Sequence, residues 1–203
     1  LLCLENTHAG KVLPLEYLKE VKKFAIGNAL RLHLDGARIF NAAVKLKVDV
    51  KEITKYFDTI SCCLSKGLGA PVGSVLCGSK DMIKKARRWR KVLGGGMRQA
   101  GILAAAGIFA LSNNIQRLKK DHENALALAQ GLSKIDGIHI DVEMVQTNIL
   151  FADITSDMGS LCNFLKKKGI IIGKNNHLRI VTHLDISRED IDYTIKAFKE
   201  FFG

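Results

Sequence analysis

The stretch "CCLSKGLGAPVGSVLCG", residues Cys62–Gly78, decides the fold that this chain is expected to adopt. It places one lysine, Lys66, at the end of an apolar run typical of a buried strand, and a second strand-like run, "GSVLCG", follows a glycine-rich turn. Glycines permit unusual backbone angles and the close approach of another group. We therefore interpret Lys66 as a functional amine at a strand end. The alternative interpretation is an ordinary surface lysine in a glycine-rich turn.

A lysine with apolar surroundings has a specific chemistry. Burial disfavours its charged form, so the neutral amine becomes available as a nucleophile for a carbonyl carbon. Schiff-base formation is the natural use of such an amine. A Schiff-base lysine that serves pyridoxal phosphate needs an acid beside the pyridine nitrogen, donors for the phosphate and an arginine for the substrate carboxylate.

Asp35 is the candidate for the acidic partner. The segment "LRLHL", residues 30–34, alternates as a strand does, and Asp35 follows at its carboxyl end. Asp35 and Lys66 are therefore expected at the same edge of a sheet, where open α/β folds hold their ligands. Aspartate is also a favoured helix N-cap, so a cap ahead of "ARIFNAAVKL" is the other interpretation of Asp35.

Strand-like and helix-like segments alternate over the first two thirds of the chain, which predicts an α/β fold with a mostly parallel sheet. Pro14 opens a helix that is expected to close at Gly27. The segment "GGGMRQAGILAAAGIFAL" then leads into a long alanine-rich helix. We place a domain boundary after Asn114, which divides the chain into a first domain, 1–114, and a second domain, 115–203.

The second domain is expected to be a small α+β domain with helices against one face of a sheet. Its strand-like segments are "IHIDV", "NILFADI", "IIIG" and "LRIVTHL". Ser187 and Asp190 have the spacing of a capping box, which predicts the start of the last helix.

The composition limits the classes of partner. The chain has 203 residues and a formal net charge of +11, but its densest basic cluster, "KKARRWRK", lies in a helix that Ser79 can cap. No nucleic-acid-binding motif accompanies this cluster, so a solvated helix face is expected and nucleic acid is not an expected partner. No apolar run approaches the roughly 18 to 20 residues that span a bilayer, and no membrane contact is expected.

The cysteines indicate a reducing compartment. Their number is odd, no pair has CxxC spacing, and four lie in apolar strand-like segments. We therefore expect buried reduced thiols in a cytoplasmic protein, with no disulfide and no zinc or other metal. The five residues are Cys3, Cys62, Cys63, Cys77 and Cys162.

Four long motifs resemble one known family. They are "LENTHAGKVLPLEYLKEV", "HLDGARIFNAAV", "LSKGLGAPVGSVLCGSKDMIKKARRWRKVLGGGMRQAGILAAAG" and "LRIVTHLDISRE". In this order they resemble the low-specificity threonine aldolases, which are pyridoxal-phosphate enzymes of the aspartate-aminotransferase fold type, fold type I. The similarity runs from about Leu4 to the carboxyl terminus. It implies that the first domain is part of a cofactor-binding large domain.

The resemblance implies a cofactor site. Lys66 would form the Schiff base with pyridoxal 5'-phosphate, and Asp35 would pair with the pyridinium nitrogen and keep the ring an electron sink. Arg38 would lie beside the cofactor and the substrate. Ser65 resembles a phosphate contact, and Arg98 resembles an arginine that reaches the phosphate region near a subunit interface. Without the resemblance, both arginines read as ordinary helix-end charges.

The resemblance also implies a reaction, the retro-aldol cleavage of threonine or allo-threonine to glycine and acetaldehyde. Arg179 would clamp the substrate carboxylate, a task suited to a planar guanidinium group; its plain alternative is a cross-strand partner. His8 is a candidate catalytic base, with an ordered water as another. His33 shares strand parity with Asp35 and is either its hydrogen-bond partner or a core histidine. His183 is given a structural role.

The family pattern is incomplete in this sequence. Relatives carry an upstream segment with a phosphate loop and a ring-stacking histidine, so the resemblance is to an N-terminally truncated enzyme. Relatives assemble as dimers or tetramers, which implies a homo-oligomer. Two alternatives stay open: a truncated, non-catalytic remnant of the fold, and another fold-type-I enzyme such as a β-eliminating lyase or an aminotransferase.

Overall fold

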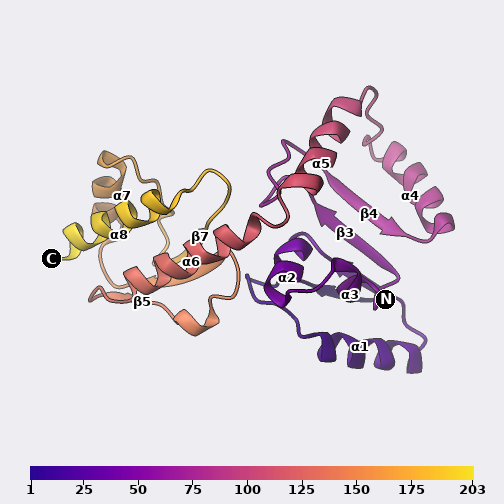
Figure 1. Ribbon diagram of the computed structural model, residues 1–203, viewed down its shortest axis with the longest axis horizontal. Coiled ribbons are helices and arrows are strands. Elements are labelled where there is room, and N and C mark those ends of the chain that lie inside the picture. Colours follow the sequence, from indigo (N-terminus) through magenta and orange to yellow (C-terminus); the bar gives the residue numbers. More distant parts are fainter. The chain divides into compact units, whose positions relative to one another are not determined.

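A computed structural model describes all residues from 1 to 203, and the chain folds into two compact units. Unit 1 comprises residues 1–8 and 12–117, and unit 2 comprises residues 9–11 and 118–203. Each unit has its own sheet (Figure 1). The short segment 9–11 therefore belongs to unit 2, although its neighbours on both sides belong to unit 1.

Unit 1 contains a four-stranded sheet of order β1-β2-β3-β4. Strands β1, β2 and β3 pair in parallel, whereas β3 and β4 pair antiparallel. The expected α/β class with a mostly parallel sheet is confirmed. The strands are β1 (Leu2–Glu5), β2 (Leu32–Asp35), β3 (Thr59–Cys63) and β4 (Ser74–Gly78).

Three helices cover the parallel part of this sheet: α1 (Leu15–Gly27), α2 (Ile39–Leu46) and α3 (Val50–Thr54). They share a core with β2, whose Leu32 and Leu34 are fully buried. Pro14 stands at the N-cap of α1, as the sequence predicts, because its fixed φ suits the start of a helix. Burying these apolar faces anchors the strand ends where the candidate site residues lie.

Two further helices of unit 1 are mostly exposed. In α4 (Lys80–Val92) no residue is buried, and the Ser79 hydroxyl caps the helix by accepting from the Met82 amide, so the expected solvated basic helix is confirmed. In α5 (Gly101–Asn113) only Gly107 and Ala110 are buried. No helix in the structure combines the length and the apolar character that crossing a membrane requires.

The burial expected for the strands that flank Lys66 is wrong for this chain. Every residue of β4 is exposed, and every residue of β3 is only half-buried. The cysteines follow the same pattern: all five are free, but Cys3 and Cys77 are exposed and the other three are half-buried. The physical reason is that β4 is an edge strand, with a neighbour on one side only.

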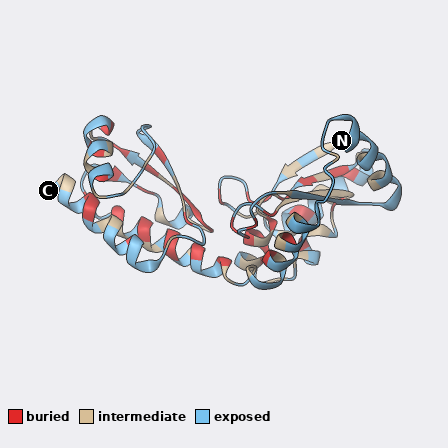
Figure 2. Cartoon of the chain, turned by 90° about the horizontal axis from the view of Figure 1, so that it is seen from above, coloured by how far each residue is buried: buried red, intermediate tan, exposed pale blue.

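Unit 2 contains a three-stranded antiparallel sheet of order β5-β6-β7. Its hydrophobic core lies between this sheet and three helices. The helices have one buried and one exposed side (Figure 2). The Ser187–Asp190 capping box is confirmed at the start of the last helix. The elements are α6 (Leu118–Leu132), β5 (Ile138–His139), η1 (Val142–Met144), β6 (Ile149–Ile154), α7 (Met158–Lys167), β7 (His177–Val181) and α8 (Arg188–Phe202).

One strand expected in this unit is not formed. The segment "IIIG", residues 170–173, is irregular, and Ile171 is 86% exposed. Its β-branched residues favour a strand, but β6 already pairs with β5 and β7 on its two sides. No edge of the central strand is left for this segment.

Asp58 is expected to make the stability of unit 1 depend on pH. Its carboxylate accepts hydrogen bonds from the Leu32 amide at 2.8 Å and from Arg31 Nη1 at 3.1 Å, and it lies 3.7 Å from Lys22 Nζ. The Leu32 hydrogen bond, followed by the two cations, holds the pKa of Asp58 below its usual value despite partial burial. This stabilisation is therefore present above the unfolded-state pKa and is lost as pH falls through the folded-state pKa.

Asp58→Asn should lower the free energy of unfolding at neutral pH by about 1 to 2 kcal/mol, because it removes charge-assisted hydrogen bonds. In acid, below the folded-state pKa, the difference from wild type should shrink towards zero. Urea unfolding of wild type and variant, at neutral pH and in acid, measures the difference in the free energy of unfolding under each condition. Asp81→Asn, in the exposed helix α4, is the control. An equal loss of stability at both pH values would contradict the electrostatic origin.

Candidate functional site

The carboxyl ends of three parallel strands meet at one edge of the unit 1 sheet. In the register, Glu5 lies opposite Asp35, and Asp35 lies opposite Ser61. His8 follows β1, Asp35 ends β2, and Lys66 follows β3. Chemistry-bearing side chains thus leave the sheet at adjacent strand ends, which is where α/β folds bind their ligands.

The loop that carries Lys66 is a compact turn. The Gly69 amide donates to the Lys66 carbonyl oxygen at 2.9 Å, and the Ala70 amide donates to the Leu64 carbonyl oxygen at 3.0 Å. Gly69 has a φ of 75°, which only glycine adopts without strain. Leu64 and Ala70 are buried, whereas Lys66 is exposed. The expectation of an apolar environment around the amine is therefore not met in this chain.

Asp35 is oriented by its own backbone. Its Oδ1 accepts a hydrogen bond from the Ala37 amide at 3.0 Å. The helix α2 begins at Ile39 with Arg38 as the N-cap residue, so the alternative interpretation of Asp35 as the cap is wrong. Gly36 lies between Asp35 and the start of α2. Its amide donates to the Ser61 carbonyl oxygen at 2.8 Å, and a Cβ on Gly36 would lie 2.8 Å from that oxygen. A glycine is needed here because β3 passes so close.

His8 is paired with a carboxylate. Its Nδ1 lies 2.6 Å from Glu5 Oε2, and the imidazole is exposed. When Nδ1 carries the proton and donates it to Glu5, the Nε2 lone pair is left as an acceptor. Glu5, which the sequence did not single out, therefore orients the His8 imidazole.

Two buried polar groups lie between Glu5 and His8. Asn6 Nδ2 and Thr7 Oγ1 have no hydrogen-bond partner within the chain, although the residues are 0% and 3% exposed. Buried polar atoms nearly always find a partner in folded proteins. Sequence reasoning missed both residues, because Asn and Thr carry no signal of their own in "LENTH".

The other residues assigned to the cofactor lie at different places in unit 1. Ser65 is exposed next to Lys66, and its Oγ lies 3.4 Å from Cys63 Sγ. Arg38 is half-buried at the start of α2. Arg98 is exposed in the loop between α4 and α5. Ser65 and Arg38 thus adjoin Lys66 and Asp35 in the chain, whereas Arg98 comes from a separate loop.

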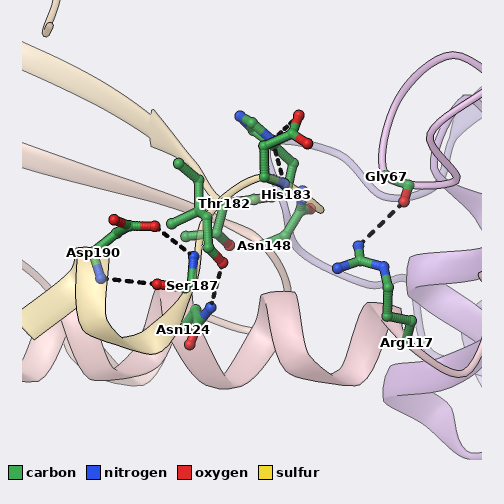
Figure 3. Close-up of polar contacts among 10 residues, drawn as sticks. Gly67, Arg117, Asn124, Asn148, Thr182, His183, Ser187 and Asp190 are labelled. Carbon is green, nitrogen blue, oxygen red and sulfur yellow. Dashed lines mark hydrogen bonds and ion pairs between the residues drawn. The ribbon is translucent and has the colours of Figure 1, made fainter. Parts of the chain in front are cut away.

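Arg179 belongs to unit 2. It lies on β7, is exposed, and faces Phe151 of β6 in the register. The end of this strand is held firmly: the Thr182 amide donates to the Asn148 carbonyl oxygen at 3.0 Å, and Asn148 Nδ2 donates to the Thr182 carbonyl oxygen at 2.9 Å (Figure 3). Both residues are buried. These two residues, which the sequence did not indicate, fix the strand that carries Arg179.

The remaining histidines of interest have local partners. His33 Nδ1 lies 2.8 Å from Thr59 Oγ1, its cross-strand neighbour, rather than bonding Asp35. His183 Nδ1 accepts the Asp185 amide at 3.3 Å. Each of these contacts joins a histidine to a nearby residue of its own unit.

The chain is similar to known proteins over its whole length. A family model described as beta-eliminating lyase matches residues 1–155. The chain is 53% identical over 204 residues to a low specificity L-threonine aldolase of Escherichia coli (strain K12), a match that covers 100% of this chain and 60% of that protein. It is 46% identical over 211 residues to a probable low-specificity L-threonine aldolase 2 of Arabidopsis thaliana, covering 100% of this chain and 59% of the relative.

Solved structures share the fold. A putative L-allo-threonine aldolase from Listeria monocytogenes has a TM-score of 0.83 at 18% identity, over 98% of this chain and 60% of that one. A serine palmitoyltransferase from S. paucimobilis has a TM-score of 0.72 at 18% identity, over 98% of this chain and 52% of that one. At such identities the likeness shows the fold alone.

Fold and strand-edge site together define an α/β protein of the fold that threonine aldolases and serine palmitoyltransferase share. The chain belongs to the beta-eliminating lyase family. The resemblance to low-specificity threonine aldolases is confirmed by its relatives. The chain spans about 60% of the length of the curated relatives that it matches.

The two adjacent thiols of β3 are expected to differ in reactivity. Burial raises the pKa of Cys63, but hydrogen bonds from Ser65 and Ser74 and the charge of Lys66 outweigh it, so this pKa lies below the usual value. Burial raises the pKa of Cys62, and the nearby Cys77 thiol adds to the rise. Since the thiolate is the nucleophile, Cys63 should react faster at neutral pH.

Iodoacetamide labelling followed by peptide mass spectrometry measures this order. Cys63 should be alkylated several-fold faster than Cys62 as long as the chain is folded, and the two rates should converge in urea. Ser65→Ala should slow the alkylation of Cys63 towards the rate of Cys62, because the substitution removes a hydrogen bond to the Cys63 thiolate. Faster labelling of Cys62 would contradict the geometry.

Proposed function

We propose that this chain is part of a pyridoxal-phosphate-dependent aldehyde lyase that cleaves threonine or allo-threonine to glycine and acetaldehyde. One observation carries the proposal. A chain 53% identical to a low specificity L-threonine aldolase has Asp35 and the Lys66 loop at the ends of neighbouring parallel strands. An amine and a carboxylate at one sheet edge are the minimal protein groups for Schiff-base chemistry with a pyridine ring.

The residues of this edge fit the cofactor. Lys66 supplies the exposed amine for its aldehyde, and the carboxylate of Asp35, oriented by the Ala37 amide, suits a protonated ring nitrogen. Ser65, Arg38 and Arg98 would supply donors and positive charge for the phosphate and its surroundings. The unpartnered polar atoms of Asn6 and Thr7 are the independent observation that favours a polar ligand at this edge.

When bound, pyridoxal phosphate supplies an electron sink for the electrons released at the substrate Cα. His8, oriented by Glu5, would take the proton of the β-hydroxyl group at Nε2. The Cα–Cβ bond would then break, the C–O bond would become the carbonyl group of acetaldehyde, and Cα would take up one proton from solvent to give glycine, which balances the proton removed from the hydroxyl group. Arg179 would hold the substrate carboxylate through its guanidinium group.

A second enzyme reaction has specific support. The family model that matches residues 1–155 is that of the beta-eliminating lyases. Lys66 and Asp35 would serve elimination equally well. Products decide between the reactions: glycine and acetaldehyde support the aldolase, whereas pyruvate supports the eliminating lyase.

The second alternative is a non-catalytic remnant of the fold, and the observation that supports it is the exposure of Lys66 and of every residue of β4. We also infer that residues 1–114 are a part of the cofactor-binding domain and that residues 115–203 form a small carboxyl-terminal domain.

A cytoplasmic location is supported by five free cysteines, because reducing compartments keep thiols unpaired.

We further propose that the chain forms a homo-oligomer, a dimer or a tetramer, through α5. This helix is apolar on all sides, yet Ile102, Ile108 and Phe109 are 82%, 65% and 64% exposed. Helices of this composition are normally buried, and contiguous exposed apolar surface marks an interaction site. The sequence resemblance implies that relatives assemble into oligomers. A second copy of this chain is therefore the favoured partner for α5.

Lys66→Ala should abolish the yellow absorbance band that appears when a protein lysine condenses with pyridoxal phosphate. The control is Lys84→Ala, which removes an exposed lysine of α4 and should leave the band unchanged. Glycine and acetaldehyde formation from threonine should likewise be lost only with Lys66. A wild-type chain that forms no band supports the remnant instead.

Ile108→Glu should lower the mass of the assembly measured by light scattering after gel filtration, because it places a charge in the proposed interface. Ile171→Glu is the matched control, since Ile171 is 86% exposed but lies in unit 2. A wild-type chain that is monomeric over the accessible concentrations would overturn the oligomer.

A further inference from the structure

The connection between α5 and α6 is bonded to the loop that carries Lys66. Asn114, the residue that ends α5, donates from Nδ2 to the Leu68 carbonyl oxygen at 2.8 Å. Arg117, the last residue of unit 1, donates from Nη2 to the Gly67 carbonyl oxygen at 3.4 Å (Figure 3). Gly67 and Leu68 directly follow Lys66, so both hydrogen bonds are made to the backbone that supports the lysine.

Side-chain packing joins the same two segments. Gly107 and Ala110 are the only buried residues of α5. A Cβ on Gly107 would lie 2.9 Å from Leu64 Cδ1, so the helix is in close contact with the residue that opens the lysine loop. Leu64 and Leu68 are themselves 8% and 3% exposed. Gly107 of α5 therefore lies against the start of this loop, and Asn114 adds a second contact at the end of the helix.

The loop needs such support from outside. Its glycines, Gly67 and Gly69, lower the cost of leaving the observed conformation, because glycine has the widest range of backbone angles. Within residues 64–73, backbone hydrogen bonds run from the Gly69 amide to the Lys66 carbonyl oxygen, from the Ala70 amide to the Leu64 carbonyl oxygen, and from the Leu64 amide to the Gly73 carbonyl oxygen, but none of them binds the Gly67 or Leu68 carbonyl oxygen. The Lys66 side chain is long and exposed, so the place of its amine depends on how well this backbone is held.

We propose that Asn114 and Arg117 are positioning residues, which hold the Lys66 backbone through the Leu68 and Gly67 carbonyl groups and so set the direction of the lysine amine. The inference rests on the proposed function of Lys66. Neither residue acts on the substrate. Their effect is orientation, for which a misplacement of about 1 Å can cost a rate factor on the order of a hundred.

The chain offers a matched pair of variants for the test. Asn114→Ala removes the hydrogen bond to the loop, whereas Asn113→Ala removes a hydrogen bond of the same length, 2.8 Å, from Asn113 Nδ2 to the Phe109 carbonyl oxygen within α5. Arg117→Ala removes the second contact. Hydrogen exchange, followed by mass spectrometry of the peptide that contains residues 64–73, reports on the loop without any cofactor.

In Asn114→Ala the amides of Gly69 and Ala70 should exchange about five- to tenfold faster, which is the effect of losing one ordinary hydrogen bond. In Asn113→Ala their rates should equal those of wild type. The pH midpoint of the yellow band formed with pyridoxal phosphate should shift in Asn114→Ala and in Arg117→Ala but not in Asn113→Ala, because only the first two change the surroundings of the lysine amine.

Two results would overturn the positioning role. The first is an unchanged rate of amide hydrogen exchange in the loop of Asn114→Ala. The second is faster exchange over the whole of unit 1, with a lower melting temperature and an unchanged pH midpoint of the band, because this combination indicates a loss of general stability only. Failure of the proposed function looks different. Wild type then forms no band, while loop exchange in the variants still decides whether Asn114 and Arg117 hold the loop.

Discussion

The register of three parallel strands is the constraint on which the rest of unit 1 depends. Because β1, β2 and β3 run in the same direction, Glu5, Asp35 and the end of β3 arrive at one edge, and the side chains that follow them leave the sheet together. The buried faces of α1, α2 and α3 hold this register through Leu32 and Leu34. A slip of one residue would turn Asp35 to the opposite face of the sheet and separate the acid from the amine.

Local hydrogen bonds then orient the groups that the sheet brings together. Ala37 holds the Asp35 carboxylate, Glu5 holds the His8 imidazole, and Ser65 bonds the Cys63 thiol next to Lys66. Each of these contacts is short in sequence, so the site is largely built from the segments that directly follow the strands. The support of the Lys66 loop by Asn114 and Arg117 is the exception, since it comes from more than forty residues further along the chain.

The groups at this sheet edge are open to solvent in the structure. Lys66, Asp35 and His8 are exposed, and β4 has no buried residue. The relatives that share its sequence are longer, and the chain spans about 60% of them. Protein that covered β4 and the Lys66 loop would strengthen every electrostatic interaction at the edge, because charges interact more strongly when water is excluded.

The sequence by itself determined the chemical inventory and much of the element order. The lysine in its glycine-rich turn, the aspartate at the end of "LRLHL" and the capping box at Ser187 follow from local pattern, as does the solvated basic helix after Ser79. These features depend on neighbouring residues, so periodicity and capping rules are enough to find them. The order of the four family motifs carried the likeness to threonine aldolases.

Only the tertiary structure decided burial, pairing and support. It left "IIIG" out of the sheet, exposed Cys77 on the edge strand β4, paired His33 with Thr59, and brought Asn114 and Arg117 to the lysine loop. These outcomes depend on which segments lie beside one another, and no local pattern encodes that. The physical reason is that strand pairing and solvent exclusion are properties of contacts between distant segments, whereas capping and periodicity are properties of adjacent ones.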